Sequence, residues 1–370
     1  MLFFRNDYGE GCIKPIMDLL VKANDESNPG YGEDAYSKRA AELIQSKLPD
    51  YPADIHFIVS GTLTNIVMIR QVLRPYEAVV SCDTGHIIEH EAGAIEAGGH
   101  KIISVPNSNG KLTAQTLEKV VRHCREDPNY LIEPRLVYIS NATEFGTVYT
   151  RAELEDLSEV CRSLDLYLMM DGARMGQALM SGIDYSLNDI ARWCDLFTVG
   201  GTKNGALFGE AALIINQNLR PYFRNIQKQS GAILAKGWLI AMQFIGLFEN
   251  DDFYKCAGYA NELGKKIQDR AIALGYPLFM KSTTNQIFVV LNPAQYNYLK
   301  DKVSFEVWTH WEDNIVIRLV TSWHTTKTDV ETLCQYLEIA MNRSKRKNEE
   351  EKELLADDVQ EEAVLNPELL

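Results

Sequence analysis

The chain contains 370 residues, 46% of them hydrophobic and 24% charged, which is ordinary for a globular protein of one large or two smaller domains. The formal net charge of −14 argues against nucleic acid or an anionic membrane surface as a partner. We find no apolar run long enough to cross a membrane, and we expect no signal peptide because charged residues come too early. The seven cysteines are scattered and form no C-x-x-C pair, so we predict reduced thiols in a cytoplasmic protein and no metal cluster.

After a first segment with little strand signal, short apolar runs alternate with helical patterns such as Thr64–Val72 and Arg151–Arg162. This alternation predicts an α/β fold with a mostly parallel seven-stranded sheet, whose ligand sites lie at the carboxyl ends of the strands. The apolar runs predicted as strands are Ile55–Val59, Ala78–Ser81, Lys101–Val105, Leu136–Ile139, Leu166–Met170, Leu196–Val199 and Ala212–Ile215.

The pattern changes after Trp238, where it becomes helical through Asn261–Leu274. Strand-like runs at Gln286–Leu291 and Ile315–Val320 and a helical pattern at Thr328–Arg343 then indicate a smaller α+β C-terminal domain. The last residues are rich in glutamate and aspartate and poor in large apolar residues, so we predict a disordered acidic tail. The predicted divisions are an N-terminal segment (1–30), a large domain (31–248), a small domain (249–343) and the tail (344–370).

A glycine-rich turn with one lysine, Lys203, follows the predicted strand Leu196–Val199. Its small neighbours let the backbone approach a ligand and leave the ammonium group poorly solvated. A lysine in such surroundings can form a Schiff base with a carbonyl compound. The alternative is a surface lysine on a turn, and the polar residues that end neighbouring strands favour the chemical role.

Asp171 and Arg174 follow the predicted strand Leu166–Met170. A carboxylate at the end of a buried strand can hold a heterocyclic nitrogen in its protonated form, which turns the ring into an electron sink. Pyridoxal phosphate requires that arrangement together with a lysine Schiff base. The alternative is an Asp–Arg pair that only stabilises a turn.

Gly61 and Thr62 lie where a predicted strand ends and a helix begins. The backbone N–H groups of a helix N-terminus, with nearby hydroxyls, suit a phosphate group. The same residues are also typical of a plain helix cap. The motif is not a P-loop, because no Gly-Lys-Ser/Thr follows it.

His86 and His90 allow three interpretations. With Glu89 they match the H-x-x-E-H pattern of a zinc site, although no distant third ligand can be identified. His86 alone could instead stack on the ring of an aromatic cofactor at the start of a helix. The third interpretation is a structural histidine.

A single arginine, Arg318, interrupts the apolar run Ile315–Val320. An arginine in a buried strand requires an anionic partner. That partner is either a nearby Asp or Glu, or the carboxylate of a substrate held by the planar guanidinium group.

Taken together, the motifs resemble the threonine aldolase group of β-eliminating lyases, which are pyridoxal-phosphate enzymes of the aspartate-aminotransferase-like fold (fold type I). The resemblance covers roughly residues 3 to 340. It implies the α/β architecture given above, with a large cofactor-binding domain and a smaller C-terminal domain. The motifs that carry it are Tyr31–Asp34, Ser60–Thr62, His86 with Glu91–Gly93, Asp171–Arg174, Thr202–Gly205 and Arg318–Thr321.

The resemblance implies a role for each matching residue around pyridoxal 5′-phosphate. Lys203 would bind the cofactor covalently, Asp171 would pair with the ring nitrogen, and Arg174 would approach the phenolic oxygen. Gly61 and Thr62 would bind the phosphate, and His86 would stack on the ring. No role for a metal is implied.

On the substrate side, the resemblance implies that Arg318 holds the substrate carboxylate and that Asn6 and Tyr31 contribute to substrate binding. Members of the family form dimers or tetramers with sites at subunit interfaces, so Tyr31 would serve a neighbouring subunit in a homo-oligomer. The chain departs from the family pattern at Asn6, where a serine is usual, and at His90, where an aromatic residue is often found. The histidine that some members place near the substrate hydroxyl has no match at a fitting spacing, although His123 lies in that region.

We therefore predict a lyase that cleaves the Cα–Cβ bond of a β-hydroxy-α-amino acid to give glycine and an aldehyde, with Lys203, His86 and Asp171 as catalytic residues. His86, or a water molecule held by a histidine, is predicted to take the proton of the β-hydroxyl group. One alternative is β-elimination or racemisation with the same cofactor. A second is a protein that binds the cofactor without catalysis, and a third is a zinc peptidase. The small amino-acid substrate is the only partner predicted besides further copies of the chain.

Overall fold

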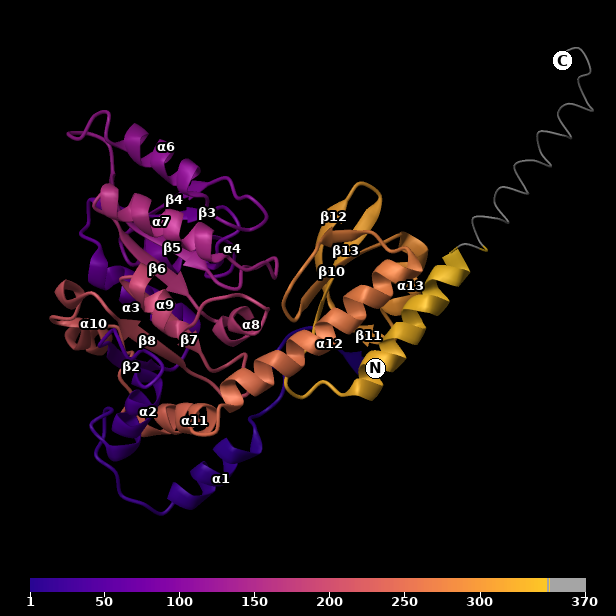
Figure 1. The fold of residues 1–370 in the computed structure, drawn as a ribbon, viewed down its shortest axis with the longest axis horizontal. Helices are drawn as coiled ribbons and strands as arrows, with labels where there is room; N and C mark the ends of the chain where they lie inside the picture. Colours follow the sequence, from indigo (N-terminus) through magenta and orange to yellow (C-terminus); the bar gives the residue numbers. More distant parts are fainter. Residues whose placement is uncertain (345, 347–370) are drawn as a thin grey trace, which may run out of the picture.

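The computed structural model describes residues 1–344 and 346. All seven apolar runs predicted as strands form strands of one sheet (Figure 1). Their bounds differ from the predicted ones by at most three residues at either end. The strands are β2 (Asp54–Ile58), β3 (Glu77–Cys82), β4 (Lys101–Val105), β5 (Glu133–Ser140), β6 (Tyr167–Asp171), β7 (Leu196–Gly200) and β8 (Glu210–Ile214).

The order of the strands across the sheet is β2-β8-β7-β6-β5-β3-β4. Strands β7, β6, β5, β3 and β4 pair in parallel. Strand β8 runs antiparallel to both β7 and β2, so β2 again points the same way as the parallel group. The sheet is therefore mostly parallel, as predicted, and the carboxyl ends of six strands meet at one edge.

Both faces of the sheet are covered by helices, which is usual for parallel sheets. Successive residues of β6 belong to different apolar clusters: Leu168 and Met170 to one, Met169 to the other. Helix α7 packs into the first cluster and helix α3 into the second. The helices of this part are α1 (Lys14–Ala23), α2 (Ala35–Gln45), α3 (Gly61–Val72), α4 (His86–Glu89), α5 (Ala94–Ala97), α6 (Ala114–Cys124), α7 (Arg151–Ser163), α8 (Met175–Leu179), α9 (Leu187–Trp193), α10 (Phe223–Gln229) and α11 (Trp238–Phe248), with a 3₁₀ turn at Gln217–Leu219.

A second, antiparallel sheet forms the core of the C-terminal part, with the order β12-β13-β10-β9. The long helix α12 (Asp252–Leu274) leads from the first sheet to this second one (Figure 1). The predicted strands Gln286–Leu291 and Ile315–Val320 form β10 (Gln286–Leu291) and β13 (Asn314–Val320), and the predicted helix Thr328–Arg343 lies within a helix over 327–344. The C-terminal part also contains β9 (Leu278–Met280), α13 (Pro293–Leu299), β11 (Val303–Ser304) and β12 (Glu306–Trp311).

The start of the chain lies beside this C-terminal part, because β1 (Leu2–Phe3) pairs in parallel with β11. The predicted acidic tail begins at Ser344, but Ser344 is still helical and buried and accepts a hydrogen bond from Asn292 at 2.6 Å. The rest of the predicted tail, apart from residue 346, lies outside the described residues. Within the described part of the chain, no helix combines the length and the apolar character that crossing a membrane requires.

Candidate active site

A cavity of about 360 Å³ opens at the carboxyl edge of the large sheet, within the size range of small-molecule sites. Six residues predicted for the cofactor site line it together. They are contributed by the ends of strands β2, β3, β6 and β7, as the rule for parallel sheets predicts. These six residues are Gly61, Thr62, His86, Asp171, Arg174 and Lys203.

Two glycines allow the ends of β6 and β7 to approach each other. A Cβ atom on Gly172 would lie 2.0 Å from the Thr198 carbonyl oxygen, and one on Gly200 would lie 2.5 Å from the Ala173 carbonyl oxygen. The Gly200 N–H donates instead to the Gly172 carbonyl at 3.0 Å. The close packing of these two turns brings the residues after β6 and after β7 to the same cavity.

Asp171 is buried, and both of its carboxylate oxygens accept hydrogen bonds. One accepts from the Ala173 N–H at 2.8 Å, and the other from the Tyr138 hydroxyl at 2.7 Å and the Asn65 amide at 3.0 Å. Burial alone would raise the pKa of Asp171, but nearby His86 and these hydrogen bonds lower it below its ordinary value. The carboxylate therefore stays ionised and can pair with a protonated ring nitrogen.

Lys203 faces the same cavity, and its Nζ lies 6.0 Å from the centre of the Tyr8 ring. Burial, followed by the positive charge of Arg174, lowers the pKa of Lys203. The negative charges of Asp7 and Asp171 oppose this effect, and Glu210 adds to them only when it is ionised. A lowered pKa increases the share of neutral amine, which is the nucleophilic form.

Glu210 begins β8 and is a second buried carboxyl group at the cavity, 4% exposed. Burial, with the negative charge of Asp171, raises the pKa of Glu210 to about 8. One oxygen accepts from the Thr202 hydroxyl at 3.1 Å. Sequence reasoning missed this residue, because a glutamate at the start of an apolar run is not distinguished from a surface residue.

The His86 ring lines the cavity at the start of α4, with its Nδ1 atom 2.8 Å from Glu91 Oε1. The same Glu91 oxygen accepts from the Asn65 amide at 2.8 Å. Because Asn65 also donates to Asp171, a continuous hydrogen-bond network orients the histidine and the aspartate relative to each other. In the sequence, Glu91 belongs to a motif and Asn65 only to a helical pattern, and the link between them requires the fold.

Arg174 is held by a residue that sequence reasoning did not single out. Its guanidinium group donates two hydrogen bonds to Asp7, at 2.8 and 2.9 Å, and both side chains are buried. Asn285 donates a further hydrogen bond to Asp7 at 2.9 Å. Tyr8, which follows Asp7 in the chain, lines the cavity. The N-terminal segment therefore forms part of the cavity wall.

Gly61 and Thr62 form the first turn of α3 at the cavity. A Cβ atom on Gly61 would meet nothing within 4 Å, so open space lies before this turn. Within the described residues, the preceding Ser60 makes no side-chain capping bond to the helix. The first backbone N–H groups of α3 are therefore available to an anion.

Glu144 also lines the cavity and was missed by sequence reasoning. It follows the carboxyl end of β5, where its carboxylate accepts from the His86 N–H at 3.0 Å and the Ser140 hydroxyl at 2.6 Å. A polar residue after a predicted strand was the signal that identified Asp171, and the same signal would have identified Glu144.

The family model of the β-eliminating lyases matches residues 12–294, which include every residue that lines the cavity except Tyr8. The chain belongs to the β-eliminating lyase family. A low-specificity L-threonine aldolase of a Pseudomonas species is 29% identical over 343 residues, 92% of this chain and 98% of that protein. The structure of a threonine aldolase of Leishmania major is 39% identical with a TM-score of 0.90, covering 92% of this chain and all of that one.

The wider fold of the lyase is that of the aminotransferases. Aspartate aminotransferase of Thermus thermophilus aligns with a TM-score of 0.70 over 92% of this chain and 91% of its own, at 12% identity. At this identity the likeness concerns the fold alone. The predicted fold class, recognised family and enzyme class are therefore confirmed.

Arg318 of the lyase lies outside the set of described residues that line the cavity. Its guanidinium group forms an ion pair with Glu306, donates to Gln286 Oε1 at 3.1 Å, and lies 4.9 Å from the centre of the Trp308 ring. Its buried Nε atom has no hydrogen-bond partner among the described residues. A structural ion pair is thus present, and one donor remains for a further acceptor, so the carboxylate-binding role stays a prediction.

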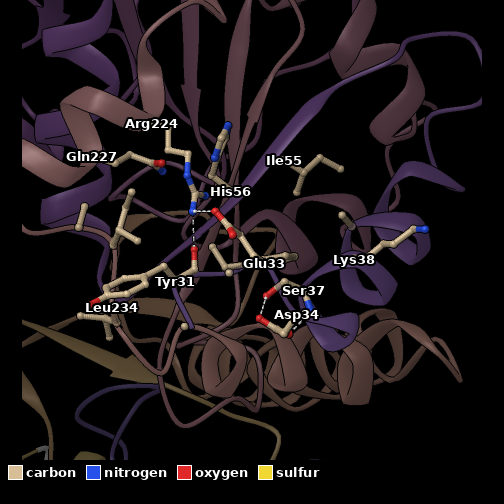
Figure 2. Close-up of a pocket in the computed structure, with 16 residues that line it drawn as sticks. Tyr31, Glu33, Asp34, Ser37, Lys38, Ile55, His56, Arg224, Gln227 and Leu234 are labelled. Atoms are coloured by element: carbon tan, nitrogen blue, oxygen red, sulfur yellow. Dashed lines mark hydrogen bonds and ion pairs between the residues drawn. The ribbon is translucent and has the colours of Figure 1, made fainter. Parts of the chain in front are cut away.

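Tyr31 lines a different pocket, beside Arg224 and Glu33 (Figure 2). Arg224 donates to the Tyr31 carbonyl at 2.8 Å and to the Glu33 carboxylate at 3.1 Å. The Tyr31 side chain is exposed, and its predicted service to a neighbouring subunit stays a prediction. Asn6 is outside the described lining of the main cavity and accepts from the Tyr8 backbone N–H at 3.1 Å, and its predicted contribution to substrate binding stays a prediction.

The two other histidines considered have different surroundings. The His123 side chain is 71% exposed near Glu126 at the end of α6, which removes it from the cavity. The His90 ring lines the cavity and lies 5.4 Å from that of His86 and 6.2 Å from that of Trp308. Among the residues that the structure describes, no group of three His, Cys, Asp or Glu is placed to hold a metal ion.

Proposed function

We propose that this lyase cleaves the Cα–Cβ bond of threonine, allo-threonine or a similar β-hydroxy-α-amino acid to give glycine and an aldehyde, using pyridoxal 5′-phosphate. The observation that carries the proposal is the convergence of Lys203 and Asp171 on one cavity. The substrate class is supported by relatives named L-threonine aldolase. The alignment with one of them covers 98% of that relative's length. The lyase family supports carbon–carbon or β-elimination chemistry over transamination.

The residues of the cavity fit the proposed cofactor. The open first turn of α3 at Gly61 suits a phosphate, and the ionised Asp171 suits a protonated ring nitrogen. The amine of Lys203 suits a bond to the aldehyde carbon. When bound, the cofactor would supply the electron sink for the pair of electrons released from the Cα–Cβ bond.

The protein groups then have separate tasks in the proposed reaction. Asp171 holds a proton on the ring nitrogen, and the His86 side chain, oriented by Glu91, packs on the ring. Arg174, fixed by Asp7, is available to the phenolic oxygen. Arg318 would hold the substrate carboxylate so that the Cα–Cβ bond stands perpendicular to the ring.

The deciding experiment is product analysis of the purified protein supplied with pyridoxal phosphate. Threonine should yield glycine and acetaldehyde in equal amounts, which an alcohol dehydrogenase assay and amino-acid chromatography measure. Ammonia with a keto acid would indicate β-elimination, and conversion of threonine into its Cα epimer, allo-threonine, without other products would indicate racemisation at Cα. Cofactor binding without any product would indicate a non-catalytic binding protein.

The proposed assembly is a homo-oligomer, either a dimer or a tetramer, and the proposed compartment is the cytoplasm. The exposed Tyr31 beside a separate pocket supports a subunit contact at that face. The seven cysteines are all unpaired thiols, which supports a reducing compartment. Light scattering of the purified protein determines the number of subunits.

A further inference from the structure

One oxygen of the Glu144 carboxylate is buried at the cavity without a partner. Its Oε1 atom accepts from the backbone N–H of His86 at 3.0 Å and from the Ser140 hydroxyl at 2.6 Å. The Oε2 atom has no hydrogen-bond partner among the described residues, although the side chain as a whole is only 8% exposed. A buried carboxylate oxygen without a partner is costly, so such an atom requires an explanation.

The other two carboxyl groups of the cavity have different positions. Both oxygens of Asp171 are already hydrogen-bonded, as described above. Glu210 lies on β8, next to β2, at the side of the cavity where α3 begins. Glu144 follows β5 and accepts a hydrogen bond from the backbone N–H of His86, at the opposite side of the cavity. The Oε2 atom of Glu210 also has no partner among the described residues, so position decides between the two: Glu144 is the one with a free acceptor that lies away from the proposed phosphate position.

The histidines of the cavity are less suited to act as a base. The Nδ1 atom of His86 is hydrogen-bonded to Glu91, and the face of the His86 ring is proposed to pack on the cofactor. The His90 side chain is exposed, and its ring lies between those of His86 and Trp308. Burial raises the pKa of Glu144, while the Ser140 hydrogen bond and the charge of His86 oppose that rise. A raised pKa makes a carboxylate a better base near neutral pH.

We propose that Glu144 is a further catalytic residue that accepts the proton of the substrate's β-hydroxyl group. This inference rests on the proposed function. In the step, the hydroxyl proton forms a bond to Glu144 Oε2, and the O–H electron pair becomes the second bond of the aldehyde carbonyl. The Cα–Cβ bond breaks, and its electron pair passes to the Cα side. Cα later takes one proton from a second donor, and Glu144 returns its proton to water, so the net change is threonine to glycine plus acetaldehyde.

The E144Q variant separates this role from a structural one. The glutamine carbonyl oxygen can still accept from the backbone N–H of His86 and from the Ser140 hydroxyl, but the side chain cannot take a proton. For E144Q we expect kcat for threonine cleavage to fall on the order of 10²- to 10⁴-fold. The melting temperature, the dissociation constant of pyridoxal phosphate and the KM for threonine should stay near the wild-type values.

A second reaction that needs no hydroxyl base sharpens the test. Exchange of the glycine α-proton with D₂O, followed by NMR, involves Cα but no β-oxygen. We expect E144Q to exchange this proton at the wild-type rate. E144D, which keeps a carboxylate on a shorter side chain, should recover part of the lost cleavage rate. E77Q is the matched control, because Glu77 is also buried but lies at the amino end of β3, on the opposite edge of the sheet.

The following outcomes would contradict the assignment of Glu144 as the base. If E144Q cleaves threonine at the wild-type rate, Glu144 is a structural acceptor only. If cleavage and glycine exchange fall by the same factor, Glu144 positions His86 or the cofactor and does not act on the hydroxyl. If E144Q does not fold, E144A replaces it, and a folded E144A that cleaves threonine with wild-type kcat excludes Glu144 as the base. If the wild-type protein exchanges glycine but cleaves no β-hydroxy amino acid, the proposed function itself is wrong.

Discussion

Arg174 and Asp7 form a buried bidentate ion pair although 167 positions separate them in the chain. Asp7 belongs to a segment whose first residues pair with β11 in the C-terminal part. Arg174 follows β6 in the large sheet. The pair therefore fixes the N-terminal segment beside the cavity, where Tyr8 forms part of the wall.

Loss of the charge on Asp7 should be strongly destabilising. In D7N, Arg174 would remain buried without a counter-charge, which typically costs about 3–5 kcal/mol of unfolding free energy. Urea unfolding of the cofactor-free protein at pH 7 measures the change. D18N is the matched control, because the Asp18–Lys14 pair is exposed and should contribute little. Equal, small effects of both variants would show that the buried pair does not hold the segment.

Lys203 should be the residue that binds the cofactor covalently. Its lowered pKa and its position in the cavity favour a Schiff base at this lysine. Reduction with borohydride followed by peptide mapping should place the pyridoxyl group on Lys203, and K203A should lose the adduct. K255A, which changes an exposed lysine, should keep it. An adduct on any other lysine contradicts the assignment.

Asp171 should be required for turnover more than for cofactor binding. D171N keeps the size of the side chain but removes the charge that pairs with the ring nitrogen, so kcat should fall by orders of magnitude while part of the cofactor is retained. Steady-state kinetics and cofactor absorbance provide the two measurements. D195N is the control, since Asp195 is half-buried and hydrogen-bonded but precedes β7 at the other edge of the sheet. Near-normal turnover of D171N would exclude the role.

Arg318 can be tested by two variants that separate its structural and substrate-binding roles. R318K keeps the positive charge but loses the planar fork, so KM for threonine should rise and kcat should fall at nearly constant melting temperature. E306Q removes the ion-pair partner and should affect stability more than KM. If R318K and E306Q share the same loss of stability and R318K keeps its KM, then Arg318 is a structural residue and the carboxylate is bound elsewhere.

The raised pKa of Glu210 predicts a pH dependence of stability. The folded protein holds the proton on Glu210 up to about pH 8, whereas an unfolded glutamate loses it near 4.5. The stabilising contribution is therefore complete at low pH and is lost as the pH rises through this window. The melting temperature of the cofactor-free wild type should fall relative to that of E210Q between these two pH values. A constant difference would show that Glu210 has an ordinary pKa.

Much of the site could be predicted because the signals are local. Asp171, Lys203 and Gly61 each follow an apolar run, and parallel strands bring the residues after their carboxyl ends to one edge. The direction of β8 could not be predicted, because an apolar run has the same pattern in either direction. Strand β12 (Glu306–Trp311) was also missed, because it is a partly exposed strand that mixes polar and aromatic residues.

The sequence by itself determined the order of strands and helices, the family, and the residues that face the cavity from strand ends, because burial periodicity and turn chemistry are written in neighbouring residues. Only the tertiary structure decided which partners these residues have. The Asp7–Arg174 pair, the Asn65 link between Glu91 and Asp171, and the free oxygen of Glu144 each depend on contacts between distant segments. Such contacts arise from packing in three dimensions, and no local pattern specifies which carboxylate is satisfied and which is left with a free acceptor.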